Sequence, residues 1–272
     1  KARIKTIIVK ELKSIAEKYG QPRKSIIIYD DVARYEEEAV EIPDYPVNLF
    51  FTKEGYFKKI TPQSLRMSGE QKLKDGDEII QELEFTNNCD LLFFTDRCQV
   101  YKAKADDFAQ TKASVLGDYV AAKLGFDEGE NAVKMVVTKD YKGMLLFAFE
   151  NGKAAKVPLE SYATKTNRKK LTGAYSDKSP LVGLLYMPED EEVLFKASSG
   201  NMLLVHTGLL ALKTTRSTQG VAVLKPKKGH RLFSVERYKE GTFTNPKRYR
   251  TASLPARGAL PVSDDSKNEQ LS

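Results

Sequence analysis

Hydrophobic and polar positions along this chain form a pattern that returns four times. In each copy an apolar strand runs into a tight turn, and a second strand that carries lysines follows. The apolar strands begin at Val47, Leu91, Met144 and Val193. The turns end at Gly55, Cys98, Gly152 and Gly200. This spacing of ~40–55 residues is typical of blade or solenoid repeats. Because one hairpin cannot bury its own apolar face, the copies must pack on one another, and the pattern predicts an all-β array of blades.

Outside the repeats, the pattern predicts one helix at the N-terminus. The isoleucines and the leucine of residues 1–19 recur at helical spacing on one face. Gly20 and then Pro22 are typical of the residues that end a helix. We expect the apolar face of this amphipathic helix to pack on another surface.

Weaker signals flank the repeats. Residues 25–29 and 39–43 are β-prone, and a fifth, weaker unit is expected over residues 231–244. The polar C-terminal residues are typical of a disordered segment. We therefore expect the end of a helix and a linker over 1–24, a β-domain of about five blades (or six) over 25–258, and a disordered tail over 259–272.

The net charge of +7 is unevenly distributed along the chain. Residues 225–258 hold ten Lys or Arg against two Glu, and residues 1–35 hold nine basic residues against four acidic ones. Residues 36–46 carry five acidic residues and no basic one, and the central repeats are close to balanced. A nucleic-acid interface must therefore be a patch on this surface and not the whole of it.

No catalytic or metal-binding constellation rises above background. His206 and His230 have no Cys or acidic residue at metal-ligand spacing, and no phosphate-binding loop or nucleophile elbow is present. We expect a non-enzymatic binding module without a cofactor or metal. The two cysteines, Cys89 and Cys98, favour a reducing, cytoplasmic setting, and no apolar stretch is long enough to cross a bilayer.

Lysines recur after the turns, and further cations lie in the loops that follow. On the second strands these are Lys58, Lys59, Lys102, Lys104, Lys153 and Lys156. In the loops they are Arg66, Lys72, Lys74, Lys112, Lys165, Arg168, Lys169, Lys170, Lys213 and Arg216. If rotation relates the blades, equivalent positions form one basic belt that contacts successive phosphates of a bent duplex, with salt-dependent affinity. The alternative is that they are solvated lysines that protect strand edges from aggregation.

Several of these segments share their pattern with one known family. They are residues 11–25, the hairpins 52–59 and 150–159, and the loop 215–221. They resemble the end of the coiled coil, the blade repeat and a blade loop in the C-terminal domain of the A subunit of bacterial type IIA DNA topoisomerases, gyrase and topoisomerase IV. The resemblance extends from the N-terminal helix to about residue 235.

The resemblance implies a β-pinwheel, a propeller-like disc whose blades exchange strands and which wraps double-stranded DNA around a basic perimeter. It implies no catalytic residue, ATP site or metal site in this domain, since the parent enzyme uses ATP and Mg²⁺ in other domains. The implied partners are DNA, the B subunit, and the remainder of the A subunit, in an enzyme of two A and two B subunits. The isolated domain is expected to be monomeric and to act in the bacterial cytoplasm.

One segment departs from the gyrase pattern. Gyrase-type domains carry the box Gln-Arg-Arg-Gly-Gly-Lys-Gly after the first hairpin, but residues 65–76 do not contain it. In the family this box goes with tight wrapping and negative supercoiling. Its absence favours a topoisomerase IV-like A subunit, with a gyrase that carries a degenerate box as the alternative.

Two further alternatives stay open at this level. The disc could be a protein-interaction module whose lysines do not bind DNA. The basic segment 225–257 could be a last blade with a DNA-facing edge, including Lys247, Arg248 and Arg250, or a flexible basic arm.

Overall fold

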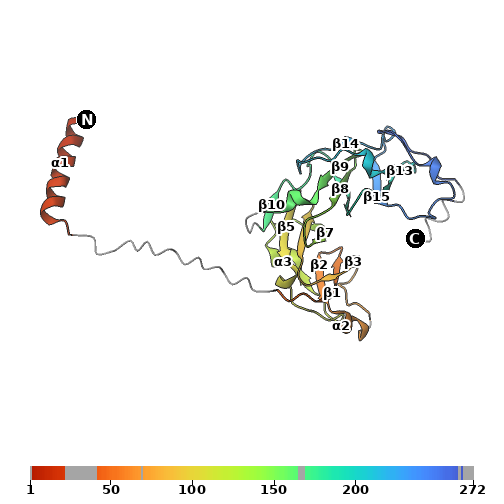
Figure 1. Ribbon diagram of the computed structural model, residues 1–272, viewed down its shortest axis with the longest axis horizontal. Coiled ribbons are helices and arrows are strands. Elements are labelled where there is room, and N and C mark those ends of the chain that lie inside the picture. The colour runs from red at the N-terminus through yellow and green to blue at the C-terminus, as the bar shows by residue number, and fades with distance from the viewer. Residues whose placement is uncertain (1, 22–41, 69, 165–168, 263–264, 266–272) are drawn as a thin grey trace. The chain divides into compact units, whose positions relative to one another are not determined.

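The computed structural model describes residues 2–21, 42–68, 70–164, 169–262 and 265. The chain divides into two compact units, Lys1–Glu41 and Ile42–Ser272 (Figure 1). The predicted N-terminal helix is confirmed as α1 (Ala2–Tyr19), and the Gly20 amide donates to the Ala16 carbonyl at its end. The predicted strand 25–29 and most of 39–43 lie outside the described residues. Among the described helices none is both long and apolar enough to span a membrane.

The second unit consists of four small sheets, which we call blades 1 to 4. Blade 1 has the strand order β3 (Ile79–Thr86), β1 (Pro46–Thr52), β2 (Tyr56–Ile60) and β6 (Asp118–Tyr119). Blade 2 has the order β10 (Lys170–Thr172), β5 (Gln99–Lys104), β4 (Asp90–Thr95) and β7 (Ala132–Thr138). Blade 3 has the order β11 (Leu181–Met187), β8 (Met144–Phe149), β9 (Lys153–Pro158) and β14 (Val221–Ala222). Blade 4 has the order β13 (Met202–His206), β12 (Glu192–Ala197) and β15 (Leu232–Arg237).

Short helices join the strands. The α-helices are α2 (Pro62–Arg66) and α3 (Val120–Leu124). The 3₁₀ helices are η1 (Ala105–Asp107), η2 (Leu159–Tyr162), η3 (Thr207–Leu209) and η4 (Pro246–Arg248).

Each predicted repeat is the central hairpin of one blade. The hairpins pair β1 with β2, β4 with β5, β8 with β9, and β12 with β13. All four predicted turn residues have positive φ, including the non-glycine Cys98 at 56°. At Gly152 space also requires glycine, because a Cβ there would lie 2.1 Å from the Leu224 carbonyl oxygen. The turn signals in the sequence therefore located the hairpins correctly.

The blades exchange their outer strands. The strand β6, which completes blade 1, follows the hairpin of blade 2 in the chain. In the same way β10 follows the hairpin of blade 3 and completes blade 2, and β14 follows the hairpin of blade 4 and completes blade 3. The remaining strand of each blade, namely β3, β7, β11 or β15, pairs with the first strand of its own hairpin. Figure 1 shows β7 on the opposite side of its hairpin from β10. We call these four the inner strands.

The three largest apolar cores lie between successive blades. Phe51 and Phe93 bring blades 1 and 2 together with their ring centroids 5.7 Å apart. Phe94 and Phe147 do the same for blades 2 and 3 at 5.7 Å. A third cluster joins blades 3 and 4. The first strand of each hairpin buries residues on both faces, as at Phe93 and Phe94, which lie in different cores, and this explains the unbroken apolar runs of the sequence.

The C-terminal segment is part of blade 4 and does not start another blade. The expected fifth unit, 231–244, begins with β15, which pairs with β12 of blade 4. The described residues form four blades instead of the expected five or six. Beyond β15, Arg250 and Ala259 form bridges to β13, and the Tyr249 hydroxyl donates to buried Asp265 at 2.6 Å. The expected tail boundary at 259 therefore falls within paired backbone, because this segment covers the free edge of β13.

Candidate nucleic-acid interface

One lysine recurs at the same place in three hairpins. Lys59, Lys102 and Lys156 each lie four residues after the turn residue of their blade and pair with a leucine of the facing strand. We call these three the inter-blade lysines. The residue at the same place in blade 4 is Leu204, which also faces a leucine. The recurrence that suggested a DNA-binding belt is therefore a real structural repeat.

The inter-blade lysines point into the protein toward the following blade. The Lys59 ammonium donates to Asn87 Oδ1 at 2.6 Å and to the Ala105 carbonyl in η1 at 2.7 Å. Lys156 donates to Asp190 Oδ1 at 2.8 Å and to the Thr207 carbonyl in η3 at 2.9 Å.

Lys102 behaves in the same way between blades 2 and 3. Its ammonium donates to the Tyr162 carbonyl in η2 at 3.2 Å and lies 4.9 Å from the centre of the Tyr141 ring. No further blade follows blade 4 among the described residues, and the residue at this place in blade 4 is apolar. Leu204 packs instead among Leu194, Phe243 and Tyr249.

Lys58 is a fourth interior lysine with a different role. It is 1% exposed and donates to Gln71 Oε1, to the Lys72 carbonyl and to the Ala113 carbonyl. It thereby holds the loop after the first hairpin against the loop that leads to β6. Burial lowers the pKa of Lys58, Lys59 and Lys102, since most of their acceptors are uncharged.

The structure corrects the predicted DNA contacts at these positions. Lys58, Lys59 and Lys156 are at most 5% exposed, so their ammonium groups cannot reach a phosphate on the surface. Lys102 is half-buried and already bonded. The sequence repeat arose from contacts between blades, which a pattern of lysines alone does not distinguish from a basic rim.

The other predicted cations are more accessible. Arg66 and Lys72 lie between β2 and β3, Lys104 is the last residue of β5, and Lys112 and Lys169 precede the outer strands β6 and β10. Arg66, Lys72, Lys104, Lys112 and Lys169 are exposed, and their side chains form no ion pair with another described residue. Lys213 is half-buried. Lys165 and Arg168 lie outside the described residues.

Other predicted contacts are occupied by partners within the chain. Lys170 pairs with Asp127 at 2.7 Å, and Arg250 bonds both oxygens of Glu192 at 2.5 and 2.7 Å. Lys153 donates to Gln219, Arg216 to the Ser161 carbonyl, and Arg248 to the Leu260 carbonyl. Exposed ion pairs contribute little, so Lys170 and Arg250 could exchange partners with a phosphate at small cost.

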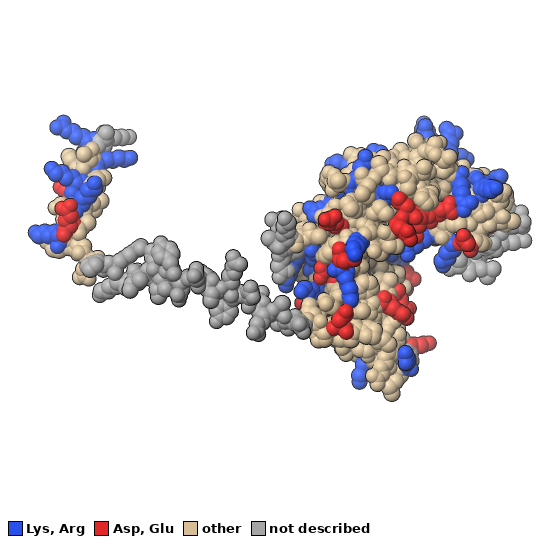
Figure 2. Space-filling model, in the orientation of Figure 1, with Lys and Arg blue, Asp and Glu red and all other residues tan. Residues whose placement is uncertain are grey.

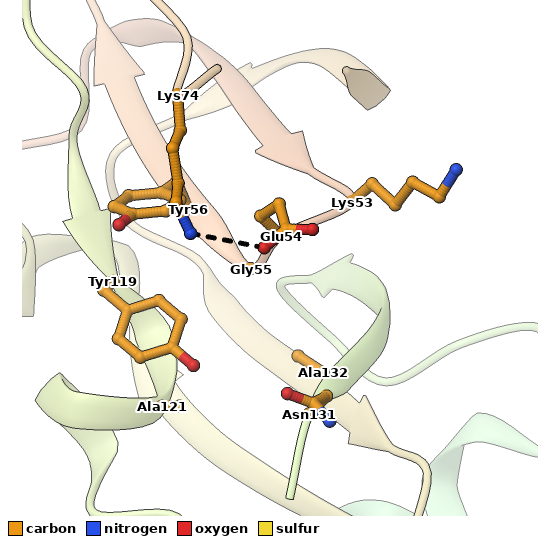
Figure 3. A pocket seen from close by; sticks show the side chains of 9 residues that line it. All are labelled: Lys53, Glu54, Gly55, Tyr56, Lys74, Tyr119, Ala121, Asn131 and Ala132. Atoms are coloured by element: carbon orange, nitrogen blue, oxygen red, sulfur yellow. Dashed lines mark hydrogen bonds and ion pairs between the residues drawn. The ribbon is translucent and has the colours of Figure 1, made fainter. Parts of the chain in front are cut away.

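Lys74 lies at a hollow beside the first hairpin turn (Figure 3). Its ammonium points toward Glu54 and lies 3.5 Å from Glu54 Oε2. The tyrosines Tyr56 and Tyr119, a cross-strand pair with ring centroids 5.4 Å apart, form another wall. The other lysine at this hollow, Lys53, pairs with Glu78 at 2.9 Å, so the hollow adds no unpaired cation to the basic surface.

The densest basic surface involves residues absent from the predicted set. The loop after β14 runs beside the C-terminal segment, since the Lys225 amide donates to the Ala256 carbonyl at 2.8 Å. Exposed cations gather there without an ion pair to another described residue. They are Lys225, Lys227, Lys228 and Arg257, and we call them the 225–257 patch.

Figure 2 shows basic side chains over the C-terminal end of the β-unit. Lys247, in η4, is exposed nearby in the chain. The local charge of residues 225–258 was the signal that located this region. Pattern matching to the hairpins missed the individual residues because they lie outside the repeat. The segment is ordered against β13, which favours the edge of a blade over a flexible arm.

Four blades, three of which are completed by an exchanged strand, define a propeller-like disc of the β-pinwheel class. No family model matches the chain. It is similar to the A subunit of DNA gyrase from Streptomyces coelicolor, with 26% identity over 254 residues that cover 87% of this chain and 29% of that protein. It is also similar to the A subunit of DNA topoisomerase 4 from Staphylococcus aureus, with 25% identity over 75% of this chain and 26% of that protein.

Two solved structures share the fold. The crystal structure of the C-terminal domain of DNA topoisomerase IV aligns with a TM-score of 0.68 and 21% identity, over 80% of this chain and 73% of that one. The structure of the DNA gyrase A C-terminal domain aligns with a TM-score of 0.54 and 19% identity, over 79% and 76%. These likenesses confirm the resemblance to the C-terminal domain of the topoisomerase A subunit. The chain spans less than a third of the curated relatives it matches.

Proposed function

We propose that this chain is an accessory DNA-binding domain of a bacterial type IIA topoisomerase A subunit. It binds duplex DNA on the outer loops of its blades and on the 225–257 patch, and it bends that DNA for strand passage. The observation that carries the proposal is the patch itself, four exposed cations without an ion pair among the described residues. The similarity to A subunits of gyrase and topoisomerase IV supports it.

Contacts with DNA phosphates explain how such a surface would bind DNA. Each Lys or Arg that neutralises a phosphate releases a counterion, so the affinity is independent of sequence and falls steeply with salt. Bending costs on the order of several kcal/mol, which contacts spread over several blades can offset. The domain itself would hold no ATP or Mg²⁺. The parent enzyme would use both in its other domains, together with the B subunit, in the bacterial cytoplasm.

The proposal is tested by sealing nicked circular DNA in the presence of the chain and reading the linking number. A shift that grows with protein concentration supports chiral wrapping, as expected of a gyrase-like domain. Binding without a shift supports bending or capture, as expected of a topoisomerase IV-like domain. Absence of binding at low salt would overturn the proposal and favour the protein-interaction module.

A further inference from the structure

The inner strands carry a repeated position that faces the next blade. Gln81 in β3 uses its side-chain amide as a short piece of strand: Nε2 donates to the Met135 carbonyl at 2.8 Å, and Oε1 accepts from the Met135 amide at 2.7 Å. The free inner edge of β7 is thereby satisfied by an amide from blade 1. This contact shows which chemistry the edge of an inner strand binds.

The next two blades treat the same position differently. Counted from the shared bulge of the inner strands, Lys134 in β7 and Gly183 in β11 are equivalent to Gln81. We call the space between the inner strands of two successive blades at this position the gap. At Gly183 the gap between blades 3 and 4 is closed, since a Cβ there would lie 2.3 Å from Val235 Cγ1 of blade 4. At Lys134 the gap is neither bridged nor closed.

The backbone that Lys134 faces is the equivalent of Met135. Leu184 pairs with Phe147 in β8 as Met135 pairs with Phe93 in β4. In an antiparallel ladder this register turns the amide and carbonyl of both residues away from the partner strand. The Leu184 N–H and C=O therefore point to the inner edge of β11, where no side-chain amide of a described residue meets them.

Two cavities meet at this place. One has a volume of about 450 Å³ and the other about 410 Å³, and both are lined by Lys134, Leu184 and Leu185. Val133 and Val182 form apolar walls of the first. The Lys134 ammonium forms no hydrogen bond or ion pair with another described residue. Burial lowers the pKa of Lys134, and the nearby Arg237 lowers it further.

We infer that this gap is a binding site for the carboxyl-terminal end of an extended peptide. A peptide amide of the ligand pairs with the Leu184 N–H and C=O as the Gln81 amide pairs with Met135, and its terminal carboxylate meets the Lys134 ammonium. Apolar side chains of the ligand fill the cavity beside Val133 and Val182. This is strand addition combined with carboxylate capture.

The second cavity is lined by Glu82, Glu84 and Arg237, and the first by Asp96, whose oxygens accept from Asn131. The balance of these charges is the same in both cavities and does not set the direction of the ligand. The Lys134 ammonium lines both cavities and is the group that the terminal carboxylate meets. DNA binding plays no part in this inference.

The experiment titrates the whole chain with N-acetyl-leucyl-leucine and, separately, with the same dipeptide capped as a carboxamide. Amide NMR shifts of Leu184 and hydrogen exchange at that amide are the readouts. We expect the free acid to shift Leu184 and to bind about tenfold more tightly than the carboxamide, because the charge-assisted hydrogen bond is lost on capping.

Two variants separate the parts of the site. Lys134→Gln should recreate the Gln81 contact one blade further on, so that the Leu184 amide becomes protected and both dipeptides lose binding. Lys134→Met should bind acid and carboxamide equally weakly. Lys142→Gln, at an exposed lysine paired with Asp140, is the matched control and should behave as wild type. A Leu184 amide already protected in the free wild type, or equal binding of acid and carboxamide to the wild type, would overturn the inference.

Discussion

The Lys156 ammonium of blade 3 lies 2.8 Å from Asp190 Oδ1, on the segment that leads into blade 4. The lysine side chain is 6% exposed and the aspartate 36% exposed. The Thr207 hydroxyl also donates to Asp190 Oδ1 at 2.8 Å. The carboxylate therefore links η3 and the segment before β12, both next to blade 4, to one lysine of blade 3. This contact, with its counterparts at Lys59 and Lys102, sets how one blade meets the next.

Removing the lysine should loosen that boundary. In Lys156→Met the Thr207 carbonyl and the Asp190 carboxylate lose a buried donor, and we expect the free energy of unfolding to fall by about 2–3 kcal/mol. Urea unfolding measures it. Lys142→Met, at a lysine whose side chain is 83% exposed, should change stability by less than about 0.5 kcal/mol. Equal effects of the two substitutions would show that the inter-blade contact adds nothing.

The same pair should make stability sensitive to acid. The hydrogen bond from Lys156, followed by that from Thr207, lowers the pKa of Asp190 below 3.8 against the opposing effect of burial. A carboxyl with a lowered native pKa contributes its full stabilisation above the ordinary value and loses it as pH falls through the native value. Asp190→Asn should therefore be less stable than wild type near neutral pH, and the difference should shrink below 3.8. Unfolding at a series of pH values tests this, and a pH-independent difference would contradict it.

Blade 4 should reject the lysine that the other blades require. Leu204→Lys places an ammonium in the apolar cluster of Leu194, Phe243 and Tyr249. We expect a loss of about 3–5 kcal/mol. Leu204→Met is the control, with an expected cost below about 1.5 kcal/mol because it keeps the volume and polarity of the site. Thermal unfolding of both variants decides, and a stable Lys variant would mean that water or a rearranged loop reaches the site.

Replacing a buried carboxylate in blade 2 by the corresponding amide should lower the stability of the protein. Glu130 is 2% exposed and accepts from Thr95 Oγ1, from the Tyr101 hydroxyl at 2.8 Å and from the Asp127 amide at 3.2 Å. Glu130→Gln turns one acceptor into a donor that faces other donors, at an expected cost of about 1–3 kcal/mol. The exposed neighbour Glu128→Gln should stay within about 0.5 kcal/mol. Chemical denaturation at neutral pH compares them.

The 225–257 patch should carry a measurable part of DNA affinity. Changing its three lysines and Arg257 together to Gln removes four exposed charges. If each meets a phosphate, the slope of log K against log salt should become shallower by about three to four. Fluorescence anisotropy with one duplex at several salt concentrations gives the slope. Lys142→Gln with Lys178→Gln, which removes two paired surface lysines outside the patch, is the control and should change the slope little. An unchanged slope would remove the patch from the interface.

The sequence was a good guide to the hairpins and a poor one to the role of their lysines. Gly55, Gly152 and Gly200 mark turns because positive φ is a local demand that glycine meets, and Cys98 was found through its place in the repeat. Whether Lys59 faces water or Asn87 depends on a residue 28 positions away in the chain, which no local pattern encodes.

The predicted number of blades was wrong for the same reason. The strand that begins at Leu232 reads as the start of another unit until its partner β12 is known. The 225–257 patch was visible in advance only as a local charge. Its exposure depends on how the segment around Ala256 lies beside Leu224, which is again a contact between distant residues.

Strand exchange determines the order in which this molecule can be made. When Ile60 has left the ribosome, the hairpin of blade 1 is complete but its outer edge is open, and the strand that covers it arrives only with Asp118 and Tyr119. Blades 2 and 3 are completed in the same way, by β10 and β14, which follow the hairpin of the next blade. A cut in a single connecting loop would therefore separate a strand from one blade while leaving its neighbour's hairpin intact. The folding and unfolding of one blade are therefore coupled to those of the next.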